Sequence, residues 1–263
     1  ESNNIIYIEE NSFQDLDNLT FLNLKSNQLT SIYEQMFNGL INLSELDLSS
    51  NRIRFLELNS FKNLHKLEFL NLEYNKIKSF SLIFSEAIFE LSLANNELDY
   101  VRIDNNLIIV SLTENNNLKH IDFEIYDNLE IIFLQRTNSK LANKINFKIF
   151  PKLETISLGF LKIDNEKLKE IRFLKNLYLR KTSLMIPNEF LLNFLKFGLE
   201  LDLSMNELEL KTKILNISSI KQSRIKSLVL IGCNLTNFDL DKSLDFSKMK
   251  KLNYLDLSMN NLT

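Results

Sequence analysis

Two histidines and one cysteine are the residues of this sequence whose types most readily support metal binding or covalent catalysis. His65 and His120 lie far apart, and neither is combined with a Cys, Asp or Glu at a spacing typical of metal sites. The chain also lacks a glycine-rich phosphate loop, a nucleophile elbow and a pair of cysteines. We therefore predict a protein that is not an enzyme, that needs no cofactor or metal, and in which both histidines are solvated loop residues.

Recognition of another macromolecule is better supported, because exposed aromatic and arginine side chains form binding hot spots. Phe133 and Tyr178 occupy equivalent positions at which the chain otherwise carries mostly small or polar residues, and Arg180 follows closely. The alternative interpretation is that this stretch is simply degenerate. The predicted ligand-binding residues are Ile131, Phe133, Gln135, Ser157, Tyr178 and Arg180.

Charged residues give a weaker signal. Glu45, Asp47 and Glu73 form an acidic stretch that could meet a basic partner, although solvation alone also explains it. The formal net charge is -3, and Lys and Arg are dispersed along the chain without a basic stripe. No apolar run reaches the roughly 18 residues of a membrane span. We therefore expect neither nucleic acid nor a membrane among the partners of this segment.

One recurring phrase must position all of these residues. It reads LTFLNLKSNQL at 19–29, LSELDLSSNRI at 43–53, LEFLNLEYNKI at 67–77 and LNYLDLSMNNL at 252–262. Its ninth position, which we call the rung, recurs at an average spacing of about 23 residues. The rungs are Asn3, Asn27, Asn51, Asn75, Asn96, Asn115, Thr137, Leu161, Thr182, Asn206, Cys233 and Asn260. Such a period predicts a solenoid of stacked turns.

Each residue type has a physical task in this unit. Alternation along a strand sends Leu22 and Leu24 inward and their neighbours to a solvent-facing side. An inward Asn at the rung can donate and accept hydrogen bonds, and so satisfies backbone groups that the following turn leaves buried. Thr and Cys keep part of this capacity. Leu161 has none, so we expect a local adjustment of the ladder there.

An aromatic residue follows ten positions after the first rungs, at Phe13, Phe37 and Phe61. We expect these rings to form a second apolar spine, continued irregularly by other phenylalanines. The expected continuations are Phe84, Phe123, Phe147 and Phe246.

The phrase and its aromatic resemble the typical, 24-residue subclass of the leucine-rich-repeat family, which occurs in Toll-like receptor, Slit-type and small proteoglycan ectodomains. The resemblance covers essentially the whole chain. It implies an α/β-type solenoid, a horseshoe with a parallel concave sheet and short helical or irregular convex turns. Cysteine commonly replaces asparagine at the rung of this family, which favours a buried structural Cys233 over a reactive thiol.

We interpret residues 1–263 as a single leucine-rich-repeat array of about twelve rungs. Terminal turns of a solenoid need a polar cap, and none is recognisable here, so we expect a fragment that lacks both caps. Sequons for N-glycosylation suit a secreted protein, but they also arise by chance in a chain so rich in Asn. The sequon asparagines are Asn18, Asn42, Asn216, Asn234 and Asn261.

The resemblance implies a recognition module, part of a Toll-like or related cell-surface receptor that binds a protein, glycan or microbial ligand on the concave face. Two alternatives stay open. One is an adhesive or extracellular-matrix leucine-rich-repeat protein; the other is an intracellular adaptor, which the scarcity of cysteine favours slightly. The first two imply an extracellular or cell-surface location and the third a cytoplasmic one. A homodimer is compatible with all three.

Overall fold

The computed structural model of the chain describes residues 3–82, 88–103, 107–124, 126–209, 223–237, 239–240, 244 and 246–263. The chain forms two compact units. Unit 1 comprises Glu1–Phe133 and Ile149–Lys152, and unit 2 comprises Leu134–Lys148 and Leu153–Thr263.

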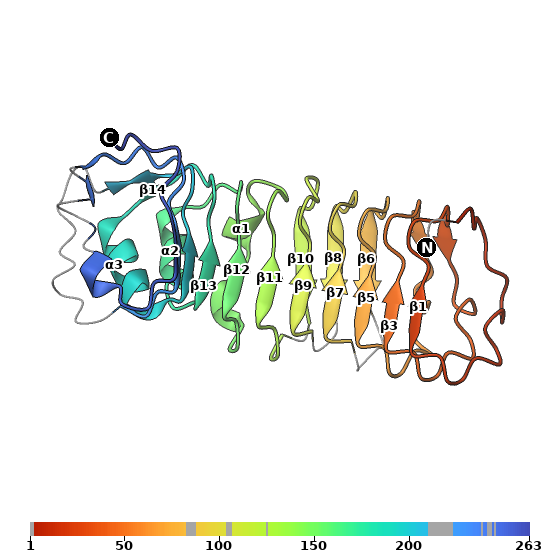
Figure 1. Cartoon of the computed structure of the whole chain (residues 1–263). Coiled ribbons are helices and arrows are strands. Elements are labelled where there is room, and N and C mark those ends of the chain that lie inside the picture. The colour runs from red at the N-terminus through yellow and green to blue at the C-terminus, as the bar shows by residue number, and fades with distance from the viewer. Residues whose placement is uncertain are drawn as a thin grey trace. The chain divides into compact units, whose positions relative to one another are not determined.

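The recurring phrase forms a three-residue strand on each turn, and the strands of successive turns pair in parallel and in sequence order (Figure 1). The order in unit 1 is β1 (Phe21–Asn23), β3 (Glu45–Asp47), β5 (Phe69–Asn71), β7 (Glu90–Ser92), β9 (Ile109–Ser111) and β11 (Ile131–Phe133). The order in unit 2 is β12 (Thr155–Ser157), β13 (Asn176–Tyr178), β15 (Glu200–Asp202), β17 (Ser227–Val229) and β18 (Tyr254–Asp256). This is the parallel sheet of a solenoid.

Register in these sheets follows the phrase. Leu22 is opposite Leu46, and Leu46 is opposite Leu70, so equivalent residues of consecutive turns lie in rows. Leu46 and Leu70 are fully buried, whereas the residues on either side of each are at least partly exposed. The alternation predicted from the sequence is therefore confirmed, and it creates a solvent-exposed strand face in each unit.

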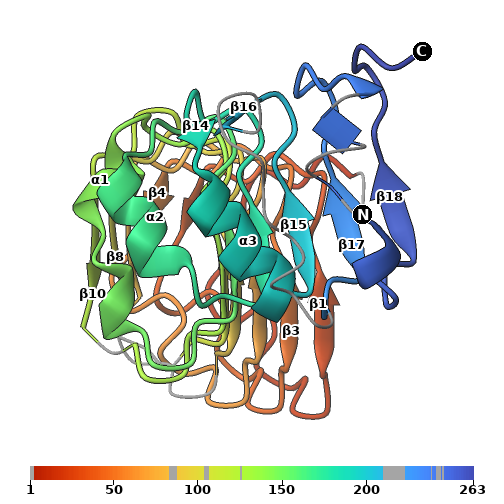
Figure 2. The same cartoon turned by 90° about the vertical axis from the view of Figure 1, so that its left-hand side faces the viewer.

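The two units differ on the side opposite the strand face. Unit 1 carries short strands there, which are β2 (Ser31–Ile32), β4 (Phe55–Leu56), β6 (Ser79–Leu82), β8 (Tyr100–Ile103) and β10 (His120–Phe123). In unit 2 the elements are α1 (Leu141–Lys144), α2 (Asn165–Ile171), β14 (Met185–Ile186), α3 (Asn188–Phe197), β16 (Glu207–Leu208) and η4 (Phe246–Lys248), and η1 (Phe147–Ile149) reaches the boundary between the units. Figure 2 shows α2 and α3 lying to one side of β15 and β17. Among the described residues, no helix has the length and apolar character needed to span a membrane.

Asparagine rungs join consecutive turns through both atoms of the side-chain amide. Asn51 Oδ1 accepts a hydrogen bond from the Leu29 amide of the preceding turn at 3.1 Å. Its Nδ2 donates to the carbonyls of Leu24 and Leu48, both at 3.0 Å. The same arrangement is present at Asn75, Asn96 and Asn115 in unit 1 and at Asn260 in unit 2. Each rung thus satisfies backbone groups of two turns.

Some rungs depart from this pattern. The Thr137 hydroxyl donates only to the Leu134 carbonyl of its own turn, at 2.8 Å. The amide and hydroxyl of Thr182 both donate to Asn206 Oδ1 at 2.9 Å. The donor to the next rung is therefore the rung residue itself, whereas at Asn51 it is the amide two positions after the preceding rung. Leu161 is buried and makes no side-chain bond, as its chemistry requires. These adjustments lie in the irregular middle of the chain.

Asn3 is exposed, and its role as the first rung stays a prediction. The first described ladder bond is made by Asn27, which accepts from the Ile5 amide at 3.1 Å. Ile5 lies two positions after Asn3, the same interval that separates Leu29 from Asn27.

The predicted aromatic spine is confirmed in the first turns of unit 1. The rings of Phe13 and Phe37 stack with centroids 6.4 Å apart, and those of Phe37 and Phe61 with centroids 6.1 Å apart. Its expected continuation Phe84 lies outside the described residues. Phe147 is buried and Phe246 is half-buried, without a stacked partner of this kind.

Candidate interaction surfaces

The residues with catalytic potential are not assembled into a site. His65 and His120 are exposed, and the described part of the chain contains no group of three or more His, Cys, Asp or Glu that could hold a metal ion. Cys233 is buried, and its Sγ lies 3.3 Å from the Leu203 carbonyl oxygen. Burial raises the pKa of this thiol from 9.0 to about 11, so it is protonated at neutral pH and is a poor nucleophile.

Five of the eleven strands end in an Asn or Asp whose side chain bonds to the backbone. In unit 1 the side chains of Asn23, Asp47 and Asn71 each accept from the amide two residues further on, at 3.0, 2.9 and 3.0 Å. In unit 2 Asp202 and Asp256 do the same, at 2.8 and 2.9 Å. These Asx-type bonds hold the strand exit. The i to i+2 spacing after an Asn or Asp was the sequence signal for this structural task, and our sequence interpretation missed it.

The acidic stretch on the early strands is a weaker candidate for binding a basic partner for this reason. Asp47 is committed to the backbone bond of its own turn. Glu73 accepts a hydrogen bond from Ser92 Oγ at 2.5 Å. Glu45 is exposed, so it is the member of the three best placed to meet a partner. Structural tasks thus account for two of the three carboxylates.

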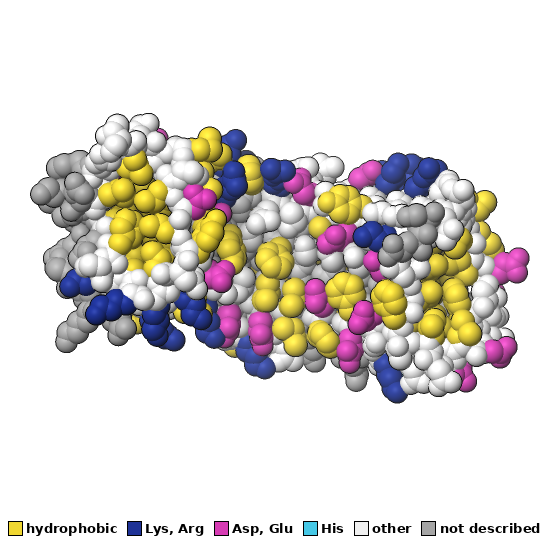
Figure 3. Space-filling model, in the orientation of Figure 1, with side chains coloured by type: hydrophobic (Ala, Val, Ile, Leu, Met, Phe, Trp, Pro, Cys, Tyr) yellow, Lys and Arg dark blue, Asp and Glu magenta, His cyan; other side chains and the backbone are white. Residues whose placement is uncertain are grey.

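Phe133 occupies the same last position on β11 and cannot make an Asx-type bond. It lies opposite Ser111 on β9, a smaller residue, and is half-buried. Ile131, at the other end of β11, lies opposite Ile109 and is also half-buried. Both predicted residues are therefore on the strand face of unit 1, and neither is required by the backbone there. Figure 3 shows hydrophobic and acidic side chains lying side by side along these strands.

Tyr178 occupies the equivalent last position on β13 in unit 2. Its hydroxyl donates to Glu200 Oε2 at 2.5 Å, and the side chain is half-buried. Burial and the adjacent carboxylate of Glu200 raise the pKa of this phenol well above its ordinary value, so it stays a hydrogen-bond donor. The bond holds the ring in one orientation on the strand face.

Gln135, Ser157 and Arg180 surround Gly159 in the same unit. Gln135 Nε2 donates to Ser157 Oγ, and Ser157 is fully buried, so its contribution is to hold Gln135 rather than to touch a ligand. A Cβ on Gly159 would lie 3.6 Å from Gln135 Cγ and 3.7 Å from Arg180 Cβ. The bare glycine therefore separates these two side chains. Arg180 Nε is buried without a hydrogen-bond partner among the described residues.

We call the group Gln135, Ser157, Tyr178 and Arg180 the unit 2 patch. The structure places these four predicted residues within one unit, on three consecutive turns. The other two predicted residues, Ile131 and Phe133, belong to unit 1. Each set is therefore considered by itself.

The sequon asparagines differ in their accessibility. Asn18 is exposed, whereas Asn42 is half-buried and its Nδ2 donates to the Asp17 carbonyl at 2.7 Å. Asn234 and Asn261 are exposed and joined by a hydrogen bond of 2.6 Å. Asn216 lies outside the described residues. Asn18 is the sequon whose amide nitrogen is best placed for modification.

Comparison with known proteins agrees with the fold. A family profile described as "Leucine rich repeat" matches residues 1–53, 22–77 and 41–98. No curated protein sequence matches the chain. The profile match covers residues 1–98, and the repeated phrase, the parallel sheet and the rung ladder give the rest of the described chain the architecture of a leucine-rich-repeat solenoid.

Solved structures share this architecture at low sequence identity. The leucine-rich repeat domain of APL1B is 21% identical with a TM-score of 0.65, covering 99% of this chain and 67% of that one. The LRIM1/APL1C complex gives 21% identity and a TM-score of 0.70, covering 99% and 47%. The Toll–Spatzle complex of Drosophila gives 18% and 0.57, covering 99% and 38%. The chain thus spans only part of each protein, and the likeness concerns the fold.

Proposed function

We propose that this leucine-rich-repeat module belongs to a Toll-like or related cell-surface receptor and binds a protein ligand through its strand faces. Phe133 in unit 1 and three members of the unit 2 patch, Gln135, Tyr178 and Arg180, are the proposed contacts. The observation that carries the proposal is an aromatic residue at the last position of a strand. In five other strands an Asn or Asp at that position serves the backbone, whereas Phe133 and Tyr178 present ring surface to solvent.

Three features support this assignment. Alternate leucines supply the core, so strand-face side chains are free to vary without loss of the fold. Tyr178 is held by Glu200, which lowers the entropy lost when a partner binds. Arg180 is half-buried, and its guanidinium can donate hydrogen bonds to a carbonyl or carboxylate of a ligand. Two of the similar solved structures are themselves complexes, LRIM1/APL1C and Toll–Spatzle.

The test uses purified chain and a panel of purified extracellular proteins and glycans in a surface-binding assay. Phe133→Ser and Tyr178→Ser are made separately. Phe55→Ser and Met185→Ser are the controls, because these side chains are more exposed than the two strand-face rings, at 51% and 52%, and lie on β4 and β14. We expect at least one strand-face change to weaken the binding of a partner about tenfold or more, with the controls neutral.

Retained affinity in both strand-face variants, with native circular dichroism, would remove the strand faces as the binding surface. Weakening by the controls alone would place the site on the opposite side. Secretion and glycosylation are tested separately, by mass spectrometry of protein expressed through a secretory pathway. A glycan at Asn18 is the expected result, and absence of any glycan would favour the intracellular adaptor.

A further inference from the structure

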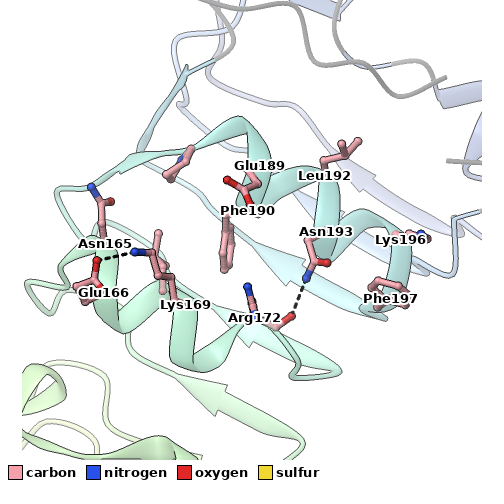
Figure 4. Close-up of a pocket in the computed structure, with 12 residues that line it drawn as sticks. Asn165, Glu166, Lys169, Arg172, Glu189, Phe190, Leu192, Asn193, Lys196 and Phe197 are labelled. Atoms are coloured by element: carbon pink, nitrogen blue, oxygen red, sulfur yellow. Dashed lines mark hydrogen bonds and ion pairs between the residues drawn. The ribbon is translucent and has the colours of Figure 1, made fainter. Parts of the chain in front are cut away.

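A groove between α2 and α3 lies in unit 2, on the side opposite the strand face (Figure 4). Its volume is about 640 Å³. Leu168 and Phe190, which are 2% and 8% exposed, form an apolar floor. A cavity of this size and character is within the range that takes a ligand or a peptide segment.

The two helices are fixed independently of any ligand. Asp164 accepts from the Lys167 amide at 2.9 Å and so caps α2. One face of α3 is buried through Phe194 and Leu195, among others. Asn193 Nδ2 on α3 donates to the Arg172 carbonyl at the end of α2, at 3.2 Å, and Figure 4 shows this bond crossing the groove. The groove is therefore a preformed feature of the fold.

A basic residue followed by a phenylalanine lies at the C-terminal end of each helix. The pair is Arg172 and Phe173 after α2, and Lys196 and Phe197 in the last turn of α3. Each pair precedes its following rung by the same interval, so the two occupy equivalent places on consecutive turns. The Arg172 Cζ lies 4.6 Å from the Phe173 ring centroid, and the Lys196 Nζ lies 5.0 Å from that of Phe197. Both are cation–π contacts.

Part of this pattern has a structural explanation. A cation in the last turn of a helix complements the helix dipole, and Lys169 is neutralised by Glu166 at 2.6 Å. The helix dipole does not explain, however, why a solvent-exposed aromatic side chain accompanies each cation. Phe173 is 73% exposed and Phe197 is 50% exposed, which leaves two large rings beside the cations. Neither Arg172 nor Lys196 has an ion-pair partner among the described residues.

We propose that this groove docks an acidic amphipathic segment of a partner protein. Apolar side chains of the segment contact Phe190 and the exposed ring of Phe197, and its carboxylates pair with Arg172 and Lys196. Charge complementarity selects this partner, because the unpaired cations lie at the helix C-terminal ends and Glu189 lies at the other end of α3. The helix-in-groove mode uses apolar side chains at helical spacing. The surface is separate from the strand face and does not depend on its function.

The experiment measures fluorescence anisotropy of the whole chain with a labelled synthetic peptide that carries leucines at helical spacing and glutamates on either side of them. The same peptide with lysines in place of the glutamates is the second probe. Lys196→Glu, Arg172→Glu and Phe197→Ser are compared with Lys250→Glu, a control that makes the same charge change at an exposed residue elsewhere in unit 2. Circular dichroism establishes that each variant is folded.

We expect the acidic probe to bind and the basic probe not to bind. The affinity of the acidic probe should fall about tenfold or more in the three groove variants, while Lys250→Glu leaves it unchanged. Equal binding of both probes, no binding of the acidic probe, or the same loss in Lys250→Glu would each overturn the proposal. The strand-face variants Phe133→Ser and Tyr178→Ser should leave this binding intact, so failure here is distinct from failure of the proposed function.

Discussion

Replacement of Asn51 by Ala removes a buried side chain that bonds to four backbone groups. The amide of Leu29 donates to Asn51 Oδ1, and the carbonyls of Leu24, Leu48 and Ser49 accept from Asn51 Nδ2. Alanine makes none of these bonds and is too small to fill the site. The Ser49 carbonyl keeps a hydrogen bond from the Ser26 amide at 3.0 Å, so the cost depends on the other three groups.

Neighbouring rungs protect the two carbonyls. Leu24 still accepts from Asn27 Nδ2 at 2.9 Å, and Leu48 still accepts from Asn75 Nδ2 at 3.0 Å. The Leu29 amide has no such substitute among the described residues, and Leu29 is fully buried. One orphaned buried donor costs about 1 to 3 kcal/mol. We therefore expect the free energy of unfolding to fall by about this amount.

Urea unfolding followed by circular dichroism measures the loss, and hydrogen exchange at the Leu29 amide reports it locally. Asn63→Ala is the control, because Asn63 is exposed and its Nδ2 donates to the Asn38 Oδ1 in an exposed hydrogen bond. It should change stability by less than about 0.5 kcal/mol. If Asn51→Ala were no more destabilising than Asn63→Ala, the account of the rung ladder would be wrong.

Three further predictions follow from single residues. Cys233 should resist alkylation at pH 8 in the folded chain; because its folded pKa is raised to about 11, the unfolded chain loses this proton first, and stability monitored by thermal melting should fall as pH rises from about 9 to about 11. Thr182→Val should lower the free energy of unfolding by about 1 kcal/mol in a urea titration, since its hydroxyl donates to Asn206. Gly39→Ala should cost more than about 3 kcal/mol in the same assay, since its Cβ would lie 2.4 Å from a backbone oxygen. Gly232→Ala, at φ 61° and with the nearest atom to its Cβ at an ordinary contact distance of 3.7 Å, should cost about 1 kcal/mol.

The sequence predicted the parts of the fold that repeat. The leucine alternation of β3 and the rung role of Asn51 follow from a local pattern, because each turn presents the same residues to its neighbours. Phe37 stacks as its spacing indicated.

The irregular turns were beyond the same reasoning. Nothing in the phrase specifies α2 or α3, which lie where the rung spacing varies. The equivalent positions of Arg172 and Lys196 become evident only once both helices are placed. Asp47 was interpreted as a surface charge, although its carboxylate serves a backbone amide. Phe133 and Tyr178 remain predicted contacts, since the fold explains their position but not their residue type.

The most direct test of strand-face recognition is hydroxyl-radical footprinting of the chain with and without a partner identified in the binding panel. Phe133 and Tyr178 are oxidisable and half-buried on the strand faces, and Phe55 on β4 serves as an internal reference. The account predicts that at least one of the two strand-face rings is protected by the partner while Phe55 is not. Protection of Phe55 with unchanged oxidation of both strand-face rings would contradict it.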